Sequence, residues 1–280
     1  VVISGVSGSG KSTLLEEVLY PNLERLLERA HTSLRNVQRI TGYESIDRVI
    51  FVDQKPIGKS SRSNPVSYIG AYDGIRKLFA SLPLAKERGF TAGTFSFNAG
   101  SGRCPTCEGK GFERVEMQFL SDVYLRCPAC DGKRFREEVR EVLYLSESGK
   151  AFSISDVLDL TVDEALEVFR GKREITEKLS VLQEVGLGYL RLGQGVPTLS
   201  GGEAQRLKLA GYLAEARGHR ESSHILFLLD EPTTGLHFED IAVLLRVLRK
   251  LIDAGHSLIV IEHNLDVIAS ADYILDLGPE

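Results

Sequence analysis

Four short blocks of this sequence carry the residue types that a site for nucleotide hydrolysis needs. They are GVSGSGKS at 5–12, LSGGE at 199–203, ILFLLDE at 225–231 and LIVIEH at 258–263. Glycines and a lysine suit phosphate groups, paired carboxylates suit a divalent cation and a water molecule, and a histidine can contact a terminal phosphate. In this order, the blocks predict an ATPase site.

The first block has the spacing of a phosphate-binding loop, with an apolar segment before it and a helical pattern after it. Its glycines allow backbone conformations in which successive amides point inward, toward an anion. Lys11 can reach the β- and γ-phosphates of ATP, and the Ser12 hydroxyl can bind Mg²⁺. An ordinary glycine- and serine-rich turn is the alternative. The residues that we assign to ATP and Mg²⁺ are Gly5, Gly8, Gly10, Lys11, Ser12 and Thr13.

Four residues that follow predicted strands supply the hydrolytic chemistry. Asp230 ends a buried apolar run, where binding of Mg²⁺ would justify a buried charge. Glu231 is the candidate general base, and His263 can hydrogen-bond the γ-phosphate. Gln54 follows the strand expected at 46–52 and could contact Mg²⁺ or the water. The alternatives are structural: a turn-capping Asp–Glu pair, a lone structural histidine and a polar turn residue.

A second anion site is predicted at Ser200–Gly202, where a small hydroxyl and two glycines open a helix and leave the backbone amides approachable. An ordinary serine N-cap is the alternative, but the surrounding LSGGEAQR favours the anion site. Together with the other blocks, this motif predicts an α/β ATPase of the ATP-binding-cassette (ABC) type. In that type the Gly-rich loop and the Ser-Gly-Gly motif of one cassette face different nucleotides, so that each ATP lies between two cassettes.

The cysteines indicate a metal site. All four lie between the first two blocks, in a C-x2-C-x19-C-x2-C pattern. Two such turns supply four thiolates, which close a tetrahedral zinc shell and leave no open position for catalysis. We therefore predict a structural Zn²⁺ bound by Cys104, Cys107, Cys127 and Cys130. Both turns read C-P-x-C-x-G-K, a local repeat of the metal knuckle.

Composition and charge narrow the remaining possibilities. The 280 residues are 42% hydrophobic and carry a net charge of −5, which by itself does not indicate a nucleic-acid-binding protein. The segment 48–88, however, holds eight Lys or Arg against three Asp or Glu, a local net charge of +5. No apolar run approaches the roughly 20 residues of a membrane span. We expect a cytoplasmic protein without a membrane partner, and a fragment of a longer chain, because Val1 already begins a strand.

The elements that position these residues follow from apolar periodicity and from breaking residues. The pattern predicts a first helix at 11–20, which Pro21 ends. Strands are expected at 1–4, 46–52, 225–229, 257–261 and 273–277, and further helices at 154–160, 162–169, 175–185, 204–216 and 238–254. We expect an ABC core at 1–58 and 196–280 without its N-terminal strands, and an inserted helical signature domain at 59–195 that contains a zinc module at 102–135.

Over nearly its whole length the chain closely resembles the C-terminal half of the UvrA family, the damage-sensing ATPases of bacterial nucleotide excision repair. Beyond the blocks above, the resemblance rests on DQKPIG at 53–58, RSNP at 62–65, FSFN at 95–98, VGLGY at 185–189, LDEPTTGLH at 229–237 and VIEHN at 260–264. It implies a zinc module and a helical signature domain, and a missing N-terminal half with a second cassette.

The resemblance also implies a function and residue roles. An ATP-dependent subunit of an excision nuclease would hydrolyse ATP at composite sites, bind damaged double-stranded DNA, dimerise and load a UvrB-like partner through the missing half. Gln54 would be the Q-loop residue, Ser200–Gly202 the signature and His263 the switch histidine, with Asp230 and Glu231 as the Walker B pair. Basic residues near the family's DNA contacts are Arg48, Lys59 and Arg62.

Other readings remain open. Departures from the family pattern at 99–100, 146–152 and 216–224 favour a UvrA-like paralogue in damage tolerance or drug resistance as an alternative. A transporter ATPase would not normally carry four thiolates before the signature. A zinc-binding chaperone module would have no use for Lys11, Asp230 or Glu231. A DNA-binding ABC clamp of the chromosome-maintenance type would insert a long coiled coil, and sustained heptads are absent from the sequence.

Overall fold

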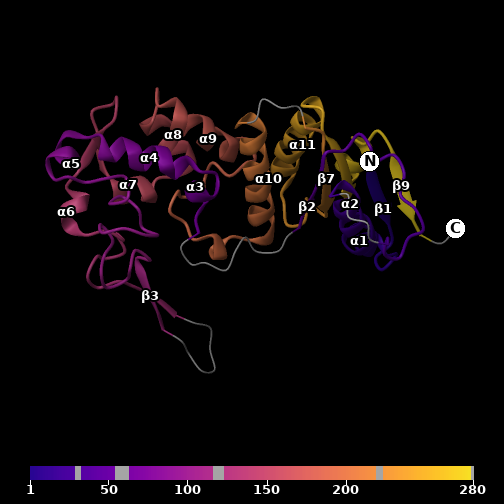
Figure 1. Ribbon diagram of the computed structural model, residues 1–280, viewed down its shortest axis with the longest axis horizontal. Helices are drawn as coiled ribbons and strands as arrows, with labels where there is room; N and C mark the ends of the chain where they lie inside the picture. Colours follow the sequence, from indigo (N-terminus) through magenta and orange to yellow (C-terminus); the bar gives the residue numbers. More distant parts are fainter. Residues whose placement is uncertain (29–32, 54–62, 116–122, 219–222, 279–280) are drawn as a thin grey trace. The chain divides into compact units, whose positions relative to one another are not determined.

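The computed structural model describes residues 1–28, 33–53, 63–115, 123–218 and 223–278 (Figure 1). The chain divides into two compact units, which are described separately below. The first unit contains Val1–Lys55 and Ser200–Glu280, and the second contains Pro56–Leu199. In the part of the chain that is described, each helix is too short or too polar to cross a bilayer.

The first unit is built on a parallel five-stranded sheet. In spatial order its strands are β2 (Arg48–Val52), β7 (Ile225–Asp230), β8 (Ser257–Ile261), β1 (Val2–Gly5) and β9 (Ile274–Leu277). All neighbouring pairs run parallel. The predicted strands are therefore present, and their carboxyl ends meet at one edge. Ligands bind at this edge in open α/β sheets.

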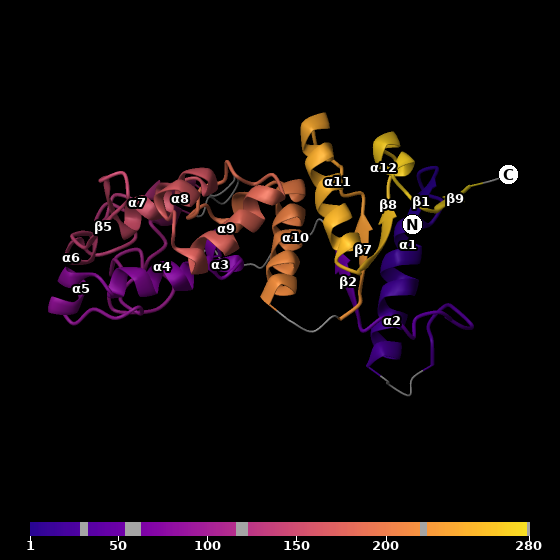
Figure 2. The ribbon, with the colours of Figure 1, turned by 90° about the horizontal axis from the view of Figure 1, so that it is seen from above.

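Helices cover both faces of the sheet, which explains the continuous apolar run of β7. Leu226 and Leu228 pack in one cluster with Leu15 and Leu23 of the first helical segment. On the other face Phe227 meets the ring of Tyr212 at a centroid distance of 5.9 Å. Figure 2 shows α1 and α2 on one side of these strands and α11 (Phe238–Asp253) on the other.

The prediction that Pro21 ends the first helix is wrong. The helical path runs through α1 (Lys11–Thr13), a π-helical stretch η1 (Leu14–Leu19) and α2 (Tyr20–Leu27). Pro21 lies in the first turn of α2, where a missing N–H does not break the helix. The wider π turn before it is closed by a bond from the Tyr20 amide to the Leu15 carbonyl. The Asn22 side chain donates to the Val18 carbonyl at 2.7 Å and so satisfies an acceptor near the junction.

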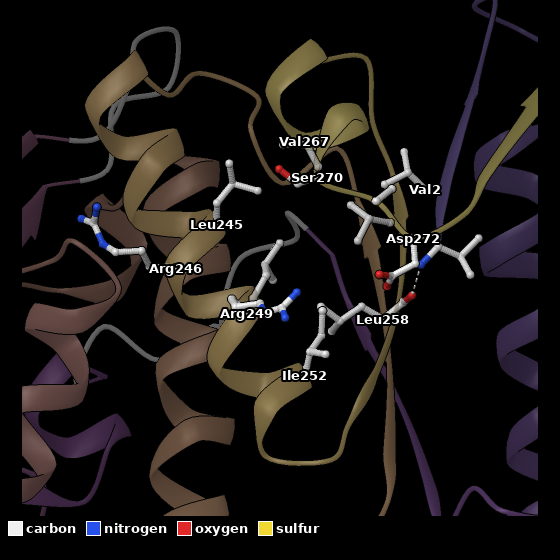
Figure 3. A pocket seen from close by; sticks show the side chains of 13 residues that line it. Val2, Leu245, Arg246, Arg249, Ile252, Leu258, Val267, Ser270 and Asp272 are labelled. Atoms are coloured by element: carbon white, nitrogen blue, oxygen red, sulfur yellow. Dashed lines mark hydrogen bonds between the residues drawn. The ribbon is translucent and has the colours of Figure 1, made fainter.

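Two further helices of this unit are α10 (Gly201–Gly218) and the short α12 (Leu265–Ala269). A pocket of about 470 Å³ lies between α11, α12 and the sheet (Figure 3). The sheet residues that line it include Val2 and Leu258, which lie toward the amino ends of their strands. The pocket is therefore separate from the edge where the predicted ATP site lies.

The second unit combines short helices with two hairpins. Its helices are α3 (Pro65–Tyr68), α4 (Ala71–Ala80), α5 (Pro83–Glu87), α6 (Glu137–Arg140), α7 (Ile154–Asp159), α8 (Val162–Val168), α9 (Arg173–Glu184) and the 3₁₀ turn η2 (Val196–Thr198). One hairpin pairs β3 (Phe112–Val115) with β4 (Val123–Arg126), and the other pairs β5 (Leu143–Leu145) with β6 (Ala151–Ser153).

Helix caps and aromatic packing stabilise the second unit. Thr161 and Glu164 form a capping box at the start of α8, and Ser153 and Asp156 form a second one at α7. The fully buried ring of Phe79 packs on Phe95 and Tyr144, at centroid distances of 5.5 and 6.4 Å. These contacts join segments that are far apart in the sequence.

Candidate ATP site and cysteine cluster

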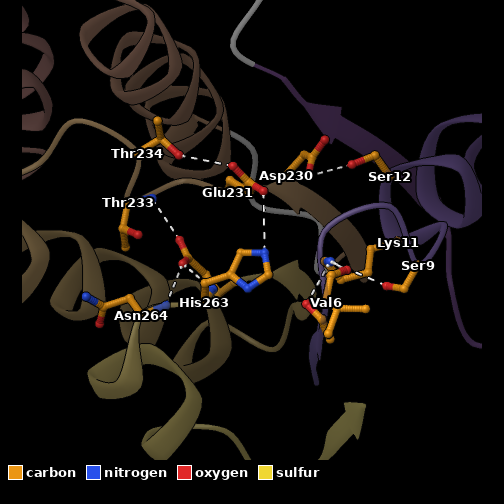
Figure 4. A network of polar contacts seen from close by, with 12 residues as sticks. Val6, Ser9, Lys11, Ser12, Asp230, Glu231, Thr233, Thr234, His263 and Asn264 are labelled. Atoms are coloured by element: carbon orange, nitrogen blue, oxygen red, sulfur yellow. Dashed lines mark hydrogen bonds and ion pairs between the residues drawn. The ribbon is translucent and has the colours of Figure 1, made fainter. Parts of the chain in front are cut away.

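The predicted ATP residues gather at the carboxyl edge of the first unit's sheet. β1 leads into the Gly-rich loop, β7 ends at Asp230, and β8 leads to His263. Figure 4 shows Lys11 and Ser12 on one side of this edge, with Asp230, Glu231 and His263 facing them. The sheet order explains the arrangement, because β8 lies between β7 and β1.

Glycine is required in the loop for two different reasons. A Cβ on Gly5 would lie 1.9 Å from the Leu277 carbonyl oxygen of β9, so a side chain cannot fit there. Gly8 and Gly10 have open space around them, but their φ angles are 81° and 90°. Side chains are disfavoured in that left-handed region. The loop therefore has the turned backbone that the sequence predicts.

The Lys11 side chain folds back into the loop and is only 6% exposed. Its ammonium group donates to the carbonyl oxygens of Gly5 at 3.0 Å and Val6 at 2.8 Å. A third contact, to the Ser9 hydroxyl, is longer at 3.5 Å. A lysine has three donors and no acceptor, so these oxygens satisfy it within the loop.

Ser12 and Asp230, the two residues predicted to bind Mg²⁺, lie next to each other. The Ser12 hydroxyl donates to Asp230 Oδ1 at 3.3 Å. Burial is the main cause that raises the pKa of Asp230, while the bond from Ser12 acts in the opposite direction. Hydroxyl and carboxylate oxygens at this spacing fit Mg²⁺, which takes one or two carboxylates and keeps several waters. Thr13 is exposed in the same helical turn.

Glu231 occupies a strained backbone position beside this pair. Its φ is 45°, in the left-handed region that a glutamate rarely adopts. Thr234 donates its hydroxyl to Glu231 Oε2 at 3.3 Å, and His263 Nε2 lies 3.6 Å from Glu231 Oε1. Strain of this kind is concentrated at functional sites, where the surroundings hold it. The carboxylate and the imidazole are both about half exposed, so a ligand can reach them.

The cysteine cluster in the second unit has the approximate twofold repeat that the sequence predicts. In each knuckle the two residues after the second cysteine are left-handed, with φ of 50° and 84° at Glu108–Gly109 and 47° and 78° at Asp131–Gly132. The knuckles also support each other. The Cys104 amide donates to the Arg134 carbonyl at 2.8 Å, and the Cys127 amide donates to the Gly111 carbonyl at 3.1 Å.

The four thiols are buried and close enough to share one ion. Their sulfur atoms lie within 4.8 Å of one another, with Cys104–Cys127 at 3.9 Å and Cys107–Cys130 at 3.7 Å. Thiolates around a tetrahedral zinc ion, with Zn–S of about 2.3 Å, lie roughly 3.8 Å apart. Burial raises the pKa of Cys130 to about 12, so the buried thiolate is unfavourable by itself. A bound cation would stabilise the thiolate and lower this pKa. The cluster is therefore compatible with zinc.

Comparisons with known proteins agree along the whole chain. The chain is 52% identical over 279 residues to UvrABC system protein A of Clostridium perfringens and 51% identical over 280 residues to that of Thermus thermophilus. It covers 29% and 28% of those proteins. The crystal structure of UvrA2 from Deinococcus radiodurans matches 99% of the chain at 47% identity, with a TM-score of 0.86, and the match covers 32% of that protein. No protein-family profile matches the chain.

The chain belongs to the UvrA family. It spans less than a third of the UvrABC system protein A chains that it matches. The α/β fold with a parallel sheet and the cysteine cluster agree with the sequence-based prediction.

The predicted signature motif, Ser200–Gly202, lies at the start of α10. The Ser200 hydroxyl accepts from the Glu203 amide at 3.3 Å, and Glu203 Oε2 accepts from the Ser200 amide at 2.8 Å. Ser200 is therefore a helix cap, as the structural alternative held, and the glycines still leave the helix start unshielded by side chains. A Cβ on Gly202 would lie 3.4 Å from the Thr234 carbonyl, so the motif packs close to the turn after Glu231. Gly201 is exposed.

The basic residues assigned to DNA are only partly described. Arg48 is exposed at the amino end of β2, the end away from the ATP edge. Lys59 and Arg62, like Gln54, lie outside the described residues. Three other cations of the 48–88 segment form ion pairs: Arg76 with Asp73, Lys77 with Glu174, and Arg88 with Glu141.

The sequence analysis did not single out three buried or half-buried residues that support the candidate ATP site. Gln205 is 1% exposed and donates to the carbonyl of Val52, while Lys208 donates to that of Asp53, at 3.2 and 3.0 Å. These bonds join α10 to the end of β2. The third residue, Glu262, is 2% exposed and is bound to backbone amides on both sides of the site. Its place beside His263, at the end of an apolar strand, was a signal available in the sequence.

Proposed function

We propose that this chain is an ATP-binding and ATP-hydrolysing cassette of a UvrA-type DNA-repair ATPase. The proposal rests chiefly on one observation: Ser12, Asp230 and Glu231 lie together beside Lys11 at the edge where parallel strands end. About 50% identity to proteins named UvrABC system protein A supports it. The ATP chemistry and the repair role are separate parts of this proposal.

Phosphate binding would begin by releasing Lys11 from the loop. Its ammonium group now bonds two neutral carbonyl oxygens, of Gly5 and Val6. Charge-assisted hydrogen bonds to phosphate oxygens are about twice as strong as neutral ones. The amides of the Gly-rich loop and the start of α1 would surround the same phosphates. Lys11 would thus exchange one set of partners for a better one, without a long side-chain movement.

Ser12 and Asp230 would hold Mg²⁺ between them. Their oxygens already face each other at 3.3 Å, and Asp230 is partly buried. When bound, Mg²⁺ would supply positive charge that offsets the negative charge developing during phosphoryl transfer. The two side chains would fix the position of that charge, and Asp230 would gain the cation that its buried carboxylate lacks.

Glu231 would orient the attacking water and accept its proton. Thr234 holds one carboxylate oxygen, and His263 lies beside the other. The imidazole can turn between this carboxylate and a γ-phosphate oxygen, which fits its proposed role as a switch. A carboxylate base works only within hydrogen-bond reach of the water, so Glu231 needs both its proton-accepting carboxylate and the position that the turn gives it.

We propose that Ser200–Gly202 completes the ATP site of another cassette. The amides at the start of α10 provide an anion-binding end, and burial between two such surfaces strengthens every charge contact. Gln54, which follows β2 in the sequence, would instead contact Mg²⁺ or the water in the site that contains Lys11. The partner cassette would belong to the rest of the intact protein, since the matched relatives are more than three times as long as this chain.

The remaining roles follow from the family. The cysteine cluster would hold one structural zinc ion, because four thiolates close its coordination shell. Arg48, Lys59 and Arg62 would contact DNA phosphates. The intact protein would act in the cytoplasm as a homodimer that binds damaged double-stranded DNA and loads a UvrB-like partner. Phosphate contacts carry no base information, so recognition would depend on how readily the damaged duplex deforms.

The experiment compares steady-state ATP hydrolysis per site by the 280-residue chain and by the intact protein, at matched site concentrations. A composite site predicts weak nucleotide binding and poor turnover by the chain alone, with activity restored in the intact protein. Addition of damaged and undamaged duplexes then tests the repair role. Equal turnover per site by the two forms contradicts the shared site. Absence of hydrolysis in the intact wild-type protein contradicts the ATPase itself.

A further inference from the structure

Glu262 has a buried carboxylate for which the proposed reaction has no use. The residue is 2% exposed. Its Oε1 accepts from the Thr233 amide at 2.8 Å, and its Oε2 accepts from the amides of His263 at 2.9 Å and Asn264 at 3.1 Å. A buried charge is unfavourable unless hydrogen bonds compensate it. Here three backbone donors converge on one side chain.

These donors come from two different turns. Thr233 belongs to the turn that follows β7, two residues after Glu231. His263 and Asn264 belong to the turn that follows β8. Glu262 itself donates its amide to the Ile3 carbonyl at 3.1 Å, so it is anchored on the strand that enters the Gly-rich loop. One side chain therefore connects the Glu231 turn and the His263 turn from a fixed point on the sheet.

This connection bears on the contact between the two candidate catalytic groups. Glu231 Oε1 and His263 Nε2 are 3.6 Å apart, although both side chains are about half exposed. Glu231 also has a left-handed φ of 45°. A strained backbone persists only where neighbouring bonds hold it. Two hydrogen bonds hold this turn, one on either side. The Thr233 amide donates to the Glu262 carboxylate, and the Glu231 amide donates to the Ile261 carbonyl at 3.0 Å.

We propose that Glu262 is a positioning residue, which fixes the turns of Glu231 and His263 relative to each other for hydrolysis. The inference rests on the proposed ATPase function. Glu262 does not touch the nucleotide, because its carboxylate is buried and bound to three amides. It acts through the backbone beneath the two catalytic candidates.

The chemistry of the side chain explains why glutamate is needed. Both oxygens accept, so only a group with two acceptors can serve both turns at once. Glutamine has the same shape but would direct an NH₂ group at one of the turns. That would place donor against donor and leave a buried amide unsatisfied. Aspartate keeps the charge but is one methylene shorter, so it can hold one turn better than both.

The first test measures kcat and KM for ATP in the intact protein carrying Glu262→Gln. Misplacement of catalytic groups by about 1 Å costs on the order of 100-fold in rate. We expect a kcat loss of that order with KM changed by less than about threefold, because Lys11 and the loop stay in place. Asp266→Asn is the control, since it removes an exposed carboxylate four residues along the same segment. Unchanged kcat in Glu262→Gln overturns the inference.

A double-mutant comparison separates positioning from general stabilisation. If Glu262 acts through the turns of Glu231 and His263, then Glu262→Gln combined with His263→Ala should be little slower than the slower single variant. If the fold-losses in kcat of the two single variants multiply in the double variant, the two residues act independently, and the proposal is contradicted.

Amide hydrogen exchange provides a readout that needs no ATPase activity. In the nucleotide-free wild-type protein, the amides of Thr233, His263 and Asn264 should be protected together. In Glu262→Gln they should exchange faster, and in Asp266→Asn they should not. Unrelated exchange rates for the three amides in the wild type contradict the inference even where the glutamine variant does not fold. Glu262→Asp keeps the charge, so its amide protection and its kcat should both lie between those of Glu262→Gln and those of the wild type. An inactive wild type with three protected amides instead contradicts the proposed function alone.

Discussion

The Ser12 hydroxyl donates to Asp230 Oδ1 at 3.3 Å and joins two residues that are 218 positions apart in the sequence. One stands at the start of the helix after β1, and the other ends β7. Burial raises the pKa of Asp230, so its ionised form is unfavourable in the folded protein without a cation. The pair therefore links metal binding to the stability of the sheet edge.

Asp230→Asn should stabilise the nucleotide-free protein and weaken its response to Mg–ATP. The folded-state pKa of Asp230 is raised, so ionisation of its carboxylate lowers the free energy of unfolding above that pKa. Asparagine keeps the acceptor for Ser12 without the charge. We expect Tm at pH 7 to rise by about 1–2 °C without ligand, and the Tm increase caused by Mg–ATP to shrink.

The pH dependence of this difference provides the check. As the pH falls below the folded-state pKa of Asp230, the wild-type carboxyl takes up a proton, and its unfavourable contribution declines until the pH is below the lower, unfolded-state pKa. The two Tm curves should therefore converge on acidification. Asp266→Asn, which changes an exposed carboxylate, is the control and should not raise Tm at pH 7. Curves that stay parallel down to the acid transition would contradict this account of Asp230.

Lys11→Ala should weaken nucleotide binding in the intact protein. The ammonium group is placed inside the Gly-rich loop by bonds to Gly5 and Val6, where phosphates would replace those oxygens. Loss of a charge-assisted hydrogen bond, worth about 1.5–3 kcal/mol, corresponds to roughly 10- to 150-fold in Kd. Titration with a fluorescent ATP analogue measures it. Lys86→Ala, at an exposed site in the other unit, should bind like the wild type.

One zinc ion per chain should be bound by the cysteine cluster. Elemental analysis of protein purified without chelator checks the stoichiometry, and much less than one zinc per chain would reject the site. Cys104→Ala should lose the metal and loosen its own knuckle and that of Cys127, which share one sulfur cluster. Nucleotide binding should change little, because the cluster and Lys11 belong to different compact units.

Charge reversal at Arg48 and Lys59 in the intact protein should weaken DNA binding without changing sequence preference. Each lost phosphate contact should make the slope of log K against log salt shallower by about 0.9. Fluorescence anisotropy at several salt concentrations measures this slope. Arg170→Glu is the control, because Arg170 is exposed and paired with Glu167. An unchanged affinity in the double variant would show that these two residues do not face DNA.

Much of the first unit could be predicted because its signals are local. The run at 225–229 is apolar on both faces, and the structure places its strand, β7, between β2 and β8. The Gly-rich loop was recognisable from the order of its glycines and lysine, since such a backbone needs positive φ angles. The cysteine spacing likewise fixed which four thiols meet.

Other features depend on contacts that a linear pattern does not contain. Pro21 is a helix breaker by propensity, but a π turn before it lets the helix continue to Leu27. The helix α4 is ordered by contacts such as Phe79 on Tyr144, across a separation of more than 60 residues. Glu262 was passed over because its role depends on the Thr233 amide, which only the folded sheet brings within 2.8 Å.

The most direct test of the central claim is ATP turnover and ATP binding by the intact protein with Glu231→Gln. Glutamine keeps the shape of the side chain and its contact with Thr234 but cannot accept a proton. We predict that kcat falls by about 100- to 1,000-fold while the affinity for ATP is retained, so that the nucleotide-bound form accumulates. The matched variant Glu17→Gln, at an exposed position of the helical segment after the Gly-rich loop, should keep most of its activity. Wild-type turnover by Glu231→Gln would contradict the assignment of this edge of the sheet as the hydrolytic site.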